Sequence, residues 1–138
     1  MILNLDHIAL LSSNLSSVIA TLPSWVRLDE PERHPSEGTL EQYAHLPGED
    51  APSLLILEPI SDGPYSRAMA KRGPGLHHFG FVTDALDDAI DYFASHGLLL
   101  HPISRYTYTK NVAWMCRPGV PFQIEIYTLP EVTQAKGK

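Results

Sequence analysis

The 138-residue sequence is poor in three features, and each absence excludes a class of protein. A single cysteine, Cys116, rules out an internal disulfide and a zinc site built from several cysteines. Ten Lys and Arg stand against 16 Asp and Glu, and the net charge of −6 argues against a nucleic-acid partner, because such a partner requires a basic face. No apolar run approaches the ~20 residues that span a bilayer.

We also expect no signal peptide, since no basic segment precedes a long apolar core in "MILNLDHIAL". We therefore expect a cytoplasmic protein. What is present is ordinary for a globular chain: 43% of the residues are hydrophobic and 19% are charged. The length suits one domain over residues 1–138.

The sequence repeats itself at a distance of 71 residues. "LDHIALLSSNLSSVIATL" (5–22) aligns with "LHHFGFVTDALDDAIDYF" (76–93), apolar residues on apolar and polar on polar. The alignment places His7 on His78. This pattern indicates a duplicated module, with one copy over 1–60, a second over 75–130 and a linker over 61–74.

Each copy predicts a strand, a helix and three further strands. The first strands, 3–11 and 76–82, run into Ser/Asn or Thr/Asp, which are good helix N-caps. Apolar residues of the second copy recur at helical spacing from Leu86 to Phe93, and Gly97 follows as a helix stop. The helix of the first copy is expected to end before Pro23. The later strands are expected at 25–29, 38–46 and 53–59, and at 98–103, 106–116 and 121–128, with a short linker helix at 64–71.

The predicted fold class is therefore α+β: two tandem βαβββ modules forming a cupped, mostly antiparallel sheet with helices on the outside. This arrangement, with a histidine in the first strand of each module, resembles the vicinal oxygen chelate superfamily (glyoxalase, bleomycin resistance and extradiol dioxygenase proteins). The motifs "LDHIAL", "EGT", "LLILEP", "GLHHFGFVTDALDDAIDYFASHG" and "IEIY" are most similar to those of methylmalonyl-CoA epimerases. The resemblance covers residues 3–128.

The resemblance implies a divalent metal ion, with ligands on the first and last strands of each module. Carried over to this chain, the ligands are His7, His78 and Glu125. Glu125 lies in "PFQIEIY", where alternation puts Gln123, Glu125 and Tyr127 on one face. This ligand set does not distinguish Fe, Co, Ni, Zn and Mn as the bound ion. His77 faces away from His78 and is expected beneath the sheet or at a subunit contact.

The fourth ligand position of the resemblance falls on a leucine. Counting back from Pro59 gives Leu55, and the 71-residue offset from Glu125 gives Leu54. Glu58 shares a strand face with the ligand position only if that position is Leu54, because side chains alternate along a strand. Two imidazoles and one carboxylate remain, which is a facial triad that suits Fe(II).

The resemblance further implies that epimerases pair the metal-binding glutamate with a second acid near the third strand. These catalytic candidates are Glu125 and Glu37. Glu41 is the alternative to Glu37, and it shares a strand face with Tyr43 and His45.

Four functions remain open. The first is a metal-dependent lyase or isomerase of the glyoxalase–epimerase type, acting on a carbonyl or thioester small molecule through a metal-stabilised enolate. The second is an extradiol-type dioxygenase with a 2-His-1-Glu iron site. The third is a metal-free protein that binds a small molecule or drug, and the fourth is a structural domain. The resemblance also implies a homodimer, while the net charge and the short apolar runs predict no nucleic-acid or membrane partner.

Overall fold

The chain divides into two compact units, and both boundaries fall inside strands. The computed structural model describes residues 1–102 and 111–129. β1 and β6 each contribute residues to both units. The N-terminal unit comprises His7–His77, and the C-terminal unit comprises Met1–Asp6 with His78–Lys138; β1 spans Leu3–Leu11 and β6 spans Gly75–Thr83.

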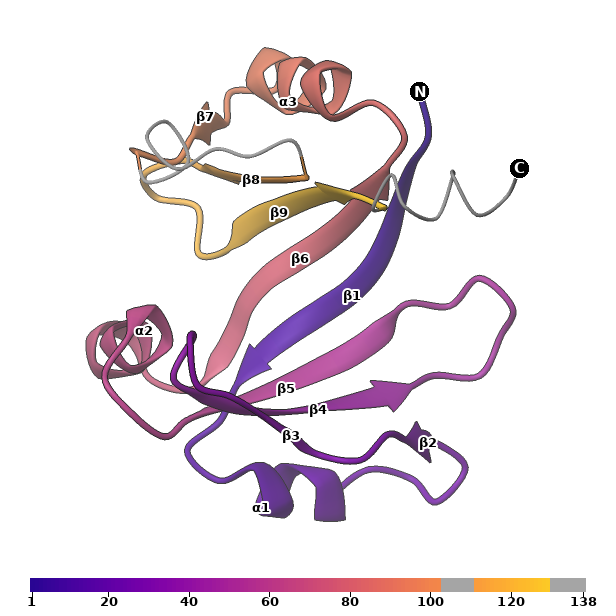
Figure 1. Cartoon of the computed structure of the whole chain (residues 1–138), viewed down its shortest axis with the longest axis vertical. Coiled ribbons are helices and arrows are strands. Elements are labelled where there is room, and N and C mark those ends of the chain that lie inside the picture. Colours follow the sequence, from indigo (N-terminus) through magenta and orange to yellow (C-terminus); the bar gives the residue numbers. More distant parts are fainter. Residues whose placement is uncertain (103–110, 130–138) are drawn as a thin grey trace. The chain divides into compact units, whose positions relative to one another are not determined.

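The N-terminal unit contains a mixed sheet in the order β2-β4-β5-β1, with the short β3 also paired to β4 (Figure 1). β1 runs parallel to β5, and the other pairs are antiparallel. Its elements after β1 are α1 (Leu15–Ala20), β2 (Arg27–Leu28), β3 (Glu32–His34), β4 (Thr39–His45), β5 (Ser53–Pro59) and α2 (Pro64–Arg72).

The helices of the N-terminal unit cover different faces of this sheet. α1 packs on β4 and β5, and it begins after Asn14, whose Oδ1 accepts a hydrogen bond from Ser17 N at 3.0 Å. α2 contributes Tyr65, Ala68 and Met69 to an apolar cluster. The sheet residues of that cluster come from the alternate positions of β1, β4 and β5, and they are Ala9, Leu11, Tyr43, Leu55 and Leu57.

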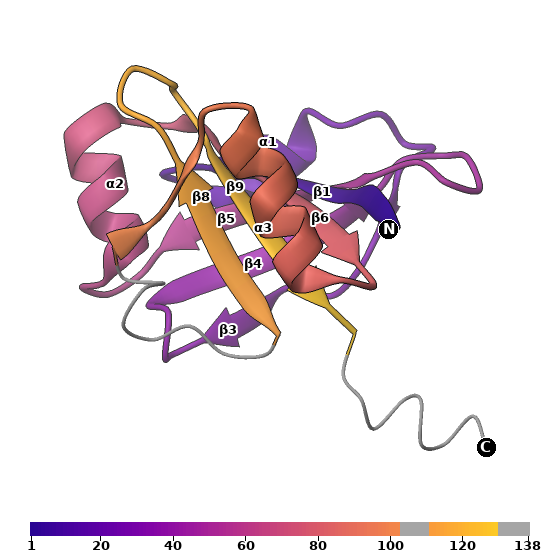
Figure 2. The ribbon, with the colours of Figure 1, turned by 90° about the horizontal axis from the view of Figure 1, so that it is seen from above.

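The C-terminal unit repeats the same plan, with the order β6-β9-β8-β7 and β6 parallel to β9. α3 packs on β7, β8 and β9, as Figure 2 shows from above. Its core joins α3 to the inward positions of β8 and β9 through Leu86, Ala89, Ala113, Met115, Ile124 and Ile126. The elements after β6 are α3 (Leu86–Ser95), β7 (Leu99–Leu100), β8 (Val112–Cys116) and β9 (Gln123–Thr128).

The sequence predicted the C-terminal end of α3 correctly and its N-cap incorrectly. Gly97 follows the helix with a φ of 92°, so the predicted stop is confirmed. The predicted Thr/Asp N-cap is wrong, because Ala85 is the N-cap residue and has no side-chain bond. Asp84 and Thr83 instead bind the backbone of Ile2: Asp84 Oδ1 accepts from Ile2 N at 2.7 Å, and Thr83 Oγ1 donates to Ile2 O at 2.6 Å.

The predicted α+β class and the repeated strand–helix–strands order are confirmed. β3 was not predicted, and the linker helix is present as α2. The part of the expected 106–116 strand before residue 111, together with residue 103 of the 98–103 strand, lies outside the described residues. No described helix has the length and apolar character needed to cross a membrane.

Candidate metal centre

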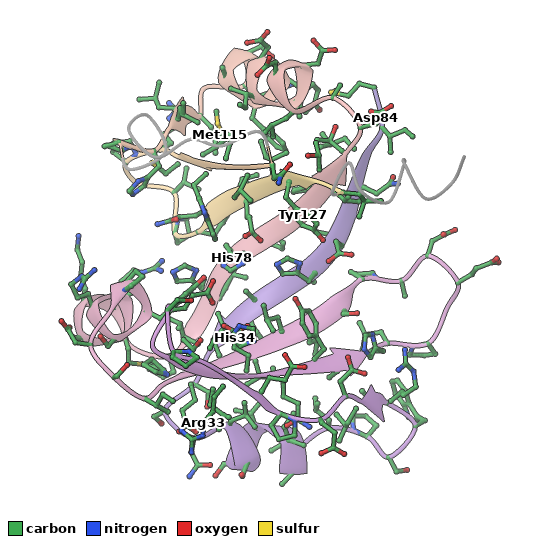
Figure 3. All side chains as sticks on the ribbon, in the orientation of Figure 1. Arg33, His34, His78, Asp84, Met115 and Tyr127 are labelled. Atoms are coloured by element: carbon green, nitrogen blue, oxygen red, sulfur yellow. The ribbon has the colours of Figure 1, made fainter. Side chains whose placement is uncertain are left out.

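His78 and Glu125 lie on the same face of the sheet in the C-terminal unit. β6 pairs with β9 so that Gly80 is opposite Glu125 and His78 is opposite Gln123, and side chains two residues apart share a face. Figure 3 shows Met115 between β8 and α3, whereas His78 and Tyr127 lie on the other side of this sheet. His78 Nε2 is 3.6 Å from Glu125 Oε1.

The surroundings of this pair make it a protected polar site. His78 is only 2% exposed, and its ring meets the Trp114 ring edge-on at a centroid distance of 4.8 Å. Trp114 is the β8 partner of Glu125, so it stands on the same face. The Glu125 side chain remains 21% exposed. Imidazole nitrogens and carboxylate oxygens are both common metal ligands.

His7 holds the matching position in the N-terminal unit. It is 4% exposed and lies opposite Ser53 on β5. Its ring meets the Tyr43 ring edge-on, with centroids 6.2 Å apart and an interplanar angle of 89°. The two histidines therefore share a buried strand position and an aromatic neighbour, Tyr43 for His7 and Trp114 for His78.

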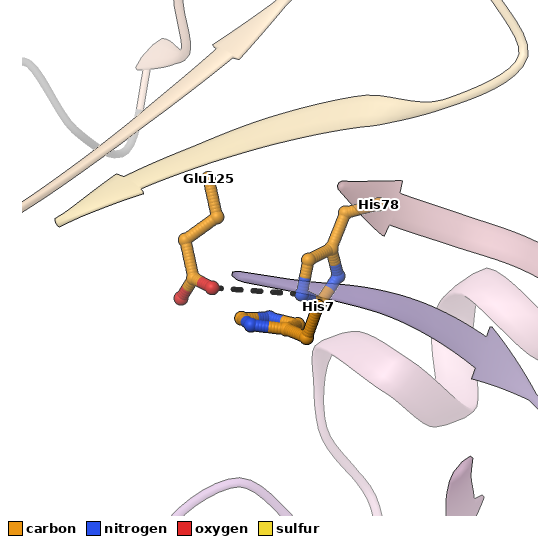
Figure 4. A group of neighbouring side chains, drawn as sticks. All are labelled: His7, His78 and Glu125. Carbon is orange, nitrogen blue, oxygen red and sulfur yellow. Dashed lines mark ion pairs between the residues drawn. The ribbon is translucent and has the colours of Figure 1, made fainter. Parts of the chain in front are cut away.

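His7, His78 and Glu125 are neighbours in the structure, and Figure 4 draws them together. Each offers one ligand atom, and these atoms all lie within 4.8 Å of one another. The three residues are those that the resemblance implies as metal ligands. Two imidazoles and one carboxylate suit Fe, Co, Ni, Zn or Mn.

The strand registers settle which residue of the first module corresponds to Glu125. Ala9 pairs with Leu55, and Gly80, 71 residues later, pairs with Glu125. The equivalent residue is therefore Leu55 and not Leu54. Leu55 is 6% exposed and packs in the apolar cluster with Tyr65 of α2, so the fourth position of the resemblance carries no ligand.

Glu58 faces the other side of the N-terminal sheet. It lies three residues from Leu55, so alternation points it away from the face that carries Leu55. Its Oε1 accepts a hydrogen bond from Leu15 N at 2.7 Å, at the start of α1. Glu58 therefore binds a helix N-terminus, where a carboxylate is electrostatically favoured.

His77 points away from the candidate centre. It is 6% exposed, and its ring lies 4.9 Å from the Tyr65 ring. Burial, together with the positive charge of Arg72, lowers the pKa of His77 from 6.5 to about 4. This imidazole is therefore neutral at physiological pH.

A second group of ligand-type side chains lies entirely within the N-terminal unit. His34, Glu37 and Glu41 each offer one atom within 4.8 Å of the others. Glu41 is 7% exposed, and its Oε2 accepts a hydrogen bond from Thr39 Oγ1 at 2.6 Å. Its Oε1 is 3.7 Å from His34 Nε2, and Glu37 is exposed in the turn before β4.

Sequence reasoning included both acids of this second group but missed His34. This histidine carries no repeat or spacing signal, and it lies in β3, a strand of three residues. Cross-strand pairing, with His34 opposite Thr39 and Glu32 opposite Glu41, brings it to the buried acid. A strand this short has too few residues for a recognisable alternation.

The chain is similar to known proteins in structure but matches none in sequence. No protein-family model matches the chain, and no curated protein sequence matches it. A solved structure of a hypothetical protein from Bacillus halodurans C-125 is 23% identical, covers 95% of this chain and 97% of its own, and has a TM-score of 0.70. These values describe a shared fold over nearly the whole of both chains.

Methylmalonyl-CoA epimerases are also among the similar structures. The Mycobacterium tuberculosis enzyme is 21% identical, covers 95% of this chain and 91% of its own, and has a TM-score of 0.68. A methylmalonyl-CoA epimerase in complex with methylmalonyl-CoA and NH4+ is 20% identical, covers 92% and 96%, and has a TM-score of 0.66.

The chain thus has the fold that its motifs indicated, and the solved structures that share this fold include methylmalonyl-CoA epimerases.

Proposed function

We propose that this protein is a metal-dependent lyase or isomerase of the glyoxalase–epimerase type, acting on a carbonyl or thioester small molecule through a metal-stabilised enolate. The observation that carries the proposal is the group His7, His78 and Glu125, with its ligand atoms within 4.8 Å of one another. The fold shared with methylmalonyl-CoA epimerases supports the same reaction class.

In this proposal, His7 and His78 bind a divalent cation through neutral imidazole nitrogens, and Glu125 supplies the single negative charge. A bound divalent ion acts as a Lewis acid on the substrate carbonyl oxygen, where negative charge develops as the adjacent carbon loses a proton. Both imidazoles are buried, and a low local dielectric would strengthen the attraction between the ion and this developing charge.

The proton needs a carboxylate base, for which the N-terminal unit offers Glu37 and Glu41 in addition to Glu125. Glu41 is better supported than Glu37 because it is buried and held by Thr39. Cross-strand pairing also places it on the face of the sheet that carries His7, through the pairs Glu41 with Leu57 and His7 with Ser53. Glu37 is exposed in the turn before β4.

Exchange of a substrate proton for deuterium tests this proposal. The full chain is incubated in D2O with a divalent ion and methylmalonyl-CoA, and deuterium at the carbon beside the carbonyl is followed by mass spectrometry. We expect exchange that stops with a chelator and returns with metal. His7→Ala and His78→Ala should lower the rate by about 100-fold, whereas His96→Asn, at the C-cap of α3, should leave it unchanged.

The same assay assigns the base. Glu41→Gln keeps the shape of the side chain and removes its charge, and we expect about a 100-fold loss of exchange with unchanged metal content. Glu37→Gln is the matched variant in the neighbouring turn, and a larger loss there would move the role to Glu37. Exchange that persists at full rate in the presence of chelator contradicts the proposed mechanism.

One observation favours an extradiol-type dioxygenase as the alternative. Leu55 at the position equivalent to Glu125 leaves a 2-His-1-carboxylate set, which is the set that non-haem Fe(II) oxygenases use. This alternative predicts iron in the purified protein and oxygen consumption with a catechol. Chelator-sensitive deuterium exchange without oxygen consumption would reject it.

A further inference from the structure

A hydrogen-bonded chain of serine, histidine and aspartate lies in the N-terminal unit, next to His7, which is the cross-strand partner of Ser53. Ser53 Oγ is 2.8 Å from His45 Nδ1, and His45 Nε2 is 2.8 Å from Asp29 Oδ2. The three residues come from the start of β5, the end of β4 and the segment after β2. Their hydrogen bonds therefore join three segments that are separate in sequence.

The sheet holds this chain in a defined geometry. His45 is the cross-strand partner of both Ser53 and Arg27. Asp29 is anchored to β4 through its backbone, since its N–H donates to Tyr43 O at 3.0 Å and its carbonyl accepts from Gln42 Nε2 at 2.8 Å.

The side chains of Asp29 and His45 are held as well. Arg27 Nη1 binds Asp29 Oδ1 at 3.3 Å, which leaves Oδ2 for the imidazole. The Tyr43 ring stacks on the His45 ring, with an interplanar angle of 16° and a centroid distance of 6.2 Å. The imidazole is thus oriented from two sides before any substrate arrives.

The partners of His45 determine which nitrogen carries the proton. An ionised carboxylate only accepts hydrogen bonds, so His45 Nε2 must be protonated to donate to Asp29. In the neutral imidazole, Nδ1 then has a free lone pair and accepts the hydrogen bond from the Ser53 hydroxyl. The hydroxyl proton of Ser53 therefore points at a base, which is the condition that activates a serine nucleophile.

We propose that Ser53 is a nucleophile for acyl transfer from carboxylic esters and thioesters, with His45 as its general base and Asp29 as the positioning residue. The recognition of such a site depends on geometry and roles, not on sequence order or fold. The proposed reaction uses neither a metal ion nor the side chains of His7, His78 and Glu125, although Ser53 is the cross-strand partner of His7.

The reaction takes place in two steps, acylation of Ser53 and hydrolysis of the acyl-serine. Ser53 Oγ attacks the acyl carbon and forms an O–C bond while its proton passes to His45 Nδ1, and the bond from the acyl carbon to the leaving alcohol or thiol breaks. The leaving group departs with the electron pair and takes the proton from His45. Water then attacks the acyl-serine with His45 as base, and releases the carboxylic acid and free Ser53.

The test uses the full chain in EDTA with p-nitrophenyl acetate. We expect a rapid release of about one p-nitrophenolate per chain and one acetyl group on Ser53, located by peptide mass spectrometry. Ser53→Ala should abolish both. Ser95→Ala is the matched control, since the Ser95 hydroxyl donates to a backbone carbonyl, Tyr92 O, at 2.6 Å, and it should react like the unmodified chain.

Asp29→Asn separates catalysis from a structural role. The amide retains the shape of the side chain, but its NH2 donates to His45 Nε2 and moves the imidazole proton to Nδ1. Acylation should then fall about 100-fold, while circular dichroism and thermal unfolding show a folded chain. Acetylation spread over other residues, an undiminished rate in folded Ser53→Ala or Asp29→Asn, or an absence of Ser53 acylation would each overturn the proposal.

Discussion

Leu55 holds the strand position at which the repeat would place a second carboxylate. Glu125 and Leu55 have equivalent partners, Gly80 and Ala9, on the parallel neighbouring strands. Tyr65 of α2 belongs to the same apolar cluster as Leu55, so this part of the sheet is filled by packing. A single residue type thus decides between three and four protein ligands at the proposed metal centre.

Replacing Leu55 by Gln tests this conclusion. The side-chain amide oxygen is a metal ligand, so we expect Leu55→Gln to bind a divalent ion about tenfold more tightly than the unmodified chain. Without metal, burial of the amide among apolar groups should lower the free energy of unfolding by about 1–3 kcal/mol. Metal titration and denaturant unfolding measure the two effects. Leu55→Met is the apolar control, and equal affinity in all three proteins would contradict the prediction.

His77 makes the stability of the metal-free chain depend on pH. Its pKa is about 4 in the folded chain and 6.5 in the unfolded chain, so the unfolded chain binds more protons between these values. The stabilising contribution of neutral His77 is complete above pH 6.5 and is lost as the pH falls towards 4. The difference in pKa corresponds to about 3 kcal/mol.

The His77→Gln variant, which does not titrate in this range, isolates this contribution. Urea unfolding at several pH values with EDTA should show a shallower loss of stability below pH 6.5 in the variant than in the unmodified chain. The comparison cancels the titration of the other histidines. Parallel pH profiles for the two proteins would show that His77 is not the group responsible.

At the scale of elements, Glu58 connects β5 to the start of α1. Its carboxylate accepts a hydrogen bond from Leu15 N, and Asn14 accepts one from Ser17 N, so two acceptors satisfy the first turn of a six-residue helix. We expect Glu58→Ala to lower the free energy of unfolding by about 1–2 kcal/mol. Denaturant unfolding measures this loss.

The same variant tests the orientation of Glu58. Because Glu58 faces away from Leu55, its replacement should leave the metal content of the chain unchanged. Loss of bound metal in a folded Glu58→Ala protein would place the carboxylate at the metal centre instead. Asn14→Ala is the matched variant at the other acceptor of α1, with an expected loss of about 1 kcal/mol.

The elements that the sequence predicted well are those whose own residues determine them. β1 and β6 are apolar strands of nine residues, and α3 has an apolar stripe at helical spacing. β3 was missed because pairing with β4, not its own pattern, makes it a strand. The N-cap of α3 was misassigned because Asp84 binds Ile2, a partner 82 residues away.

The candidate site residues divide in the same way: some are visible in the sequence, and others come together only through contacts between segments. The repeat makes His7 and His78 visible in the sequence, and strand alternation makes Glu125 visible. Nothing in the sequence pairs His34 with Glu41 or Asp29 with His45. The first contact joins β3 to β4, and the second joins β4 to the residue that follows β2. Residues that depend on cross-strand pairing therefore required the structure.

At the scale of the whole molecule, the duplicated plan is preserved in topology and altered in detail. The equivalent first strands differ by 71 residues, and the equivalent last strands differ by 70, as Leu55 and Glu125 show. The two halves have equivalent histidines in their first strands and differ at the last strand, where one has a carboxylate and the other a core leucine.

Metal binding should stabilise the complete chain. An ion that binds only the folded state raises the free energy of unfolding by about 2.7 kcal/mol at a free concentration of 100 times its Kd. For a chain of this size, that energy corresponds to an increase in Tm on the order of 10 °C. Thermal unfolding with Fe(II), Co(II), Ni(II), Zn(II) or Mn(II), each added to EDTA-treated protein after dialysis, measures the increase and ranks the ions.

The increase should vanish in His7→Ala and in His78→Ala, because each variant leaves only two of the three proposed ligands. His96→Asn should respond like the unmodified chain, which controls for binding to surface histidines. An equal rise in Tm in all four proteins would mean that the stabilising ion binds elsewhere. A rise that is lost with His34→Ala but kept with His7→Ala would place the ion at His34, Glu37 and Glu41 instead.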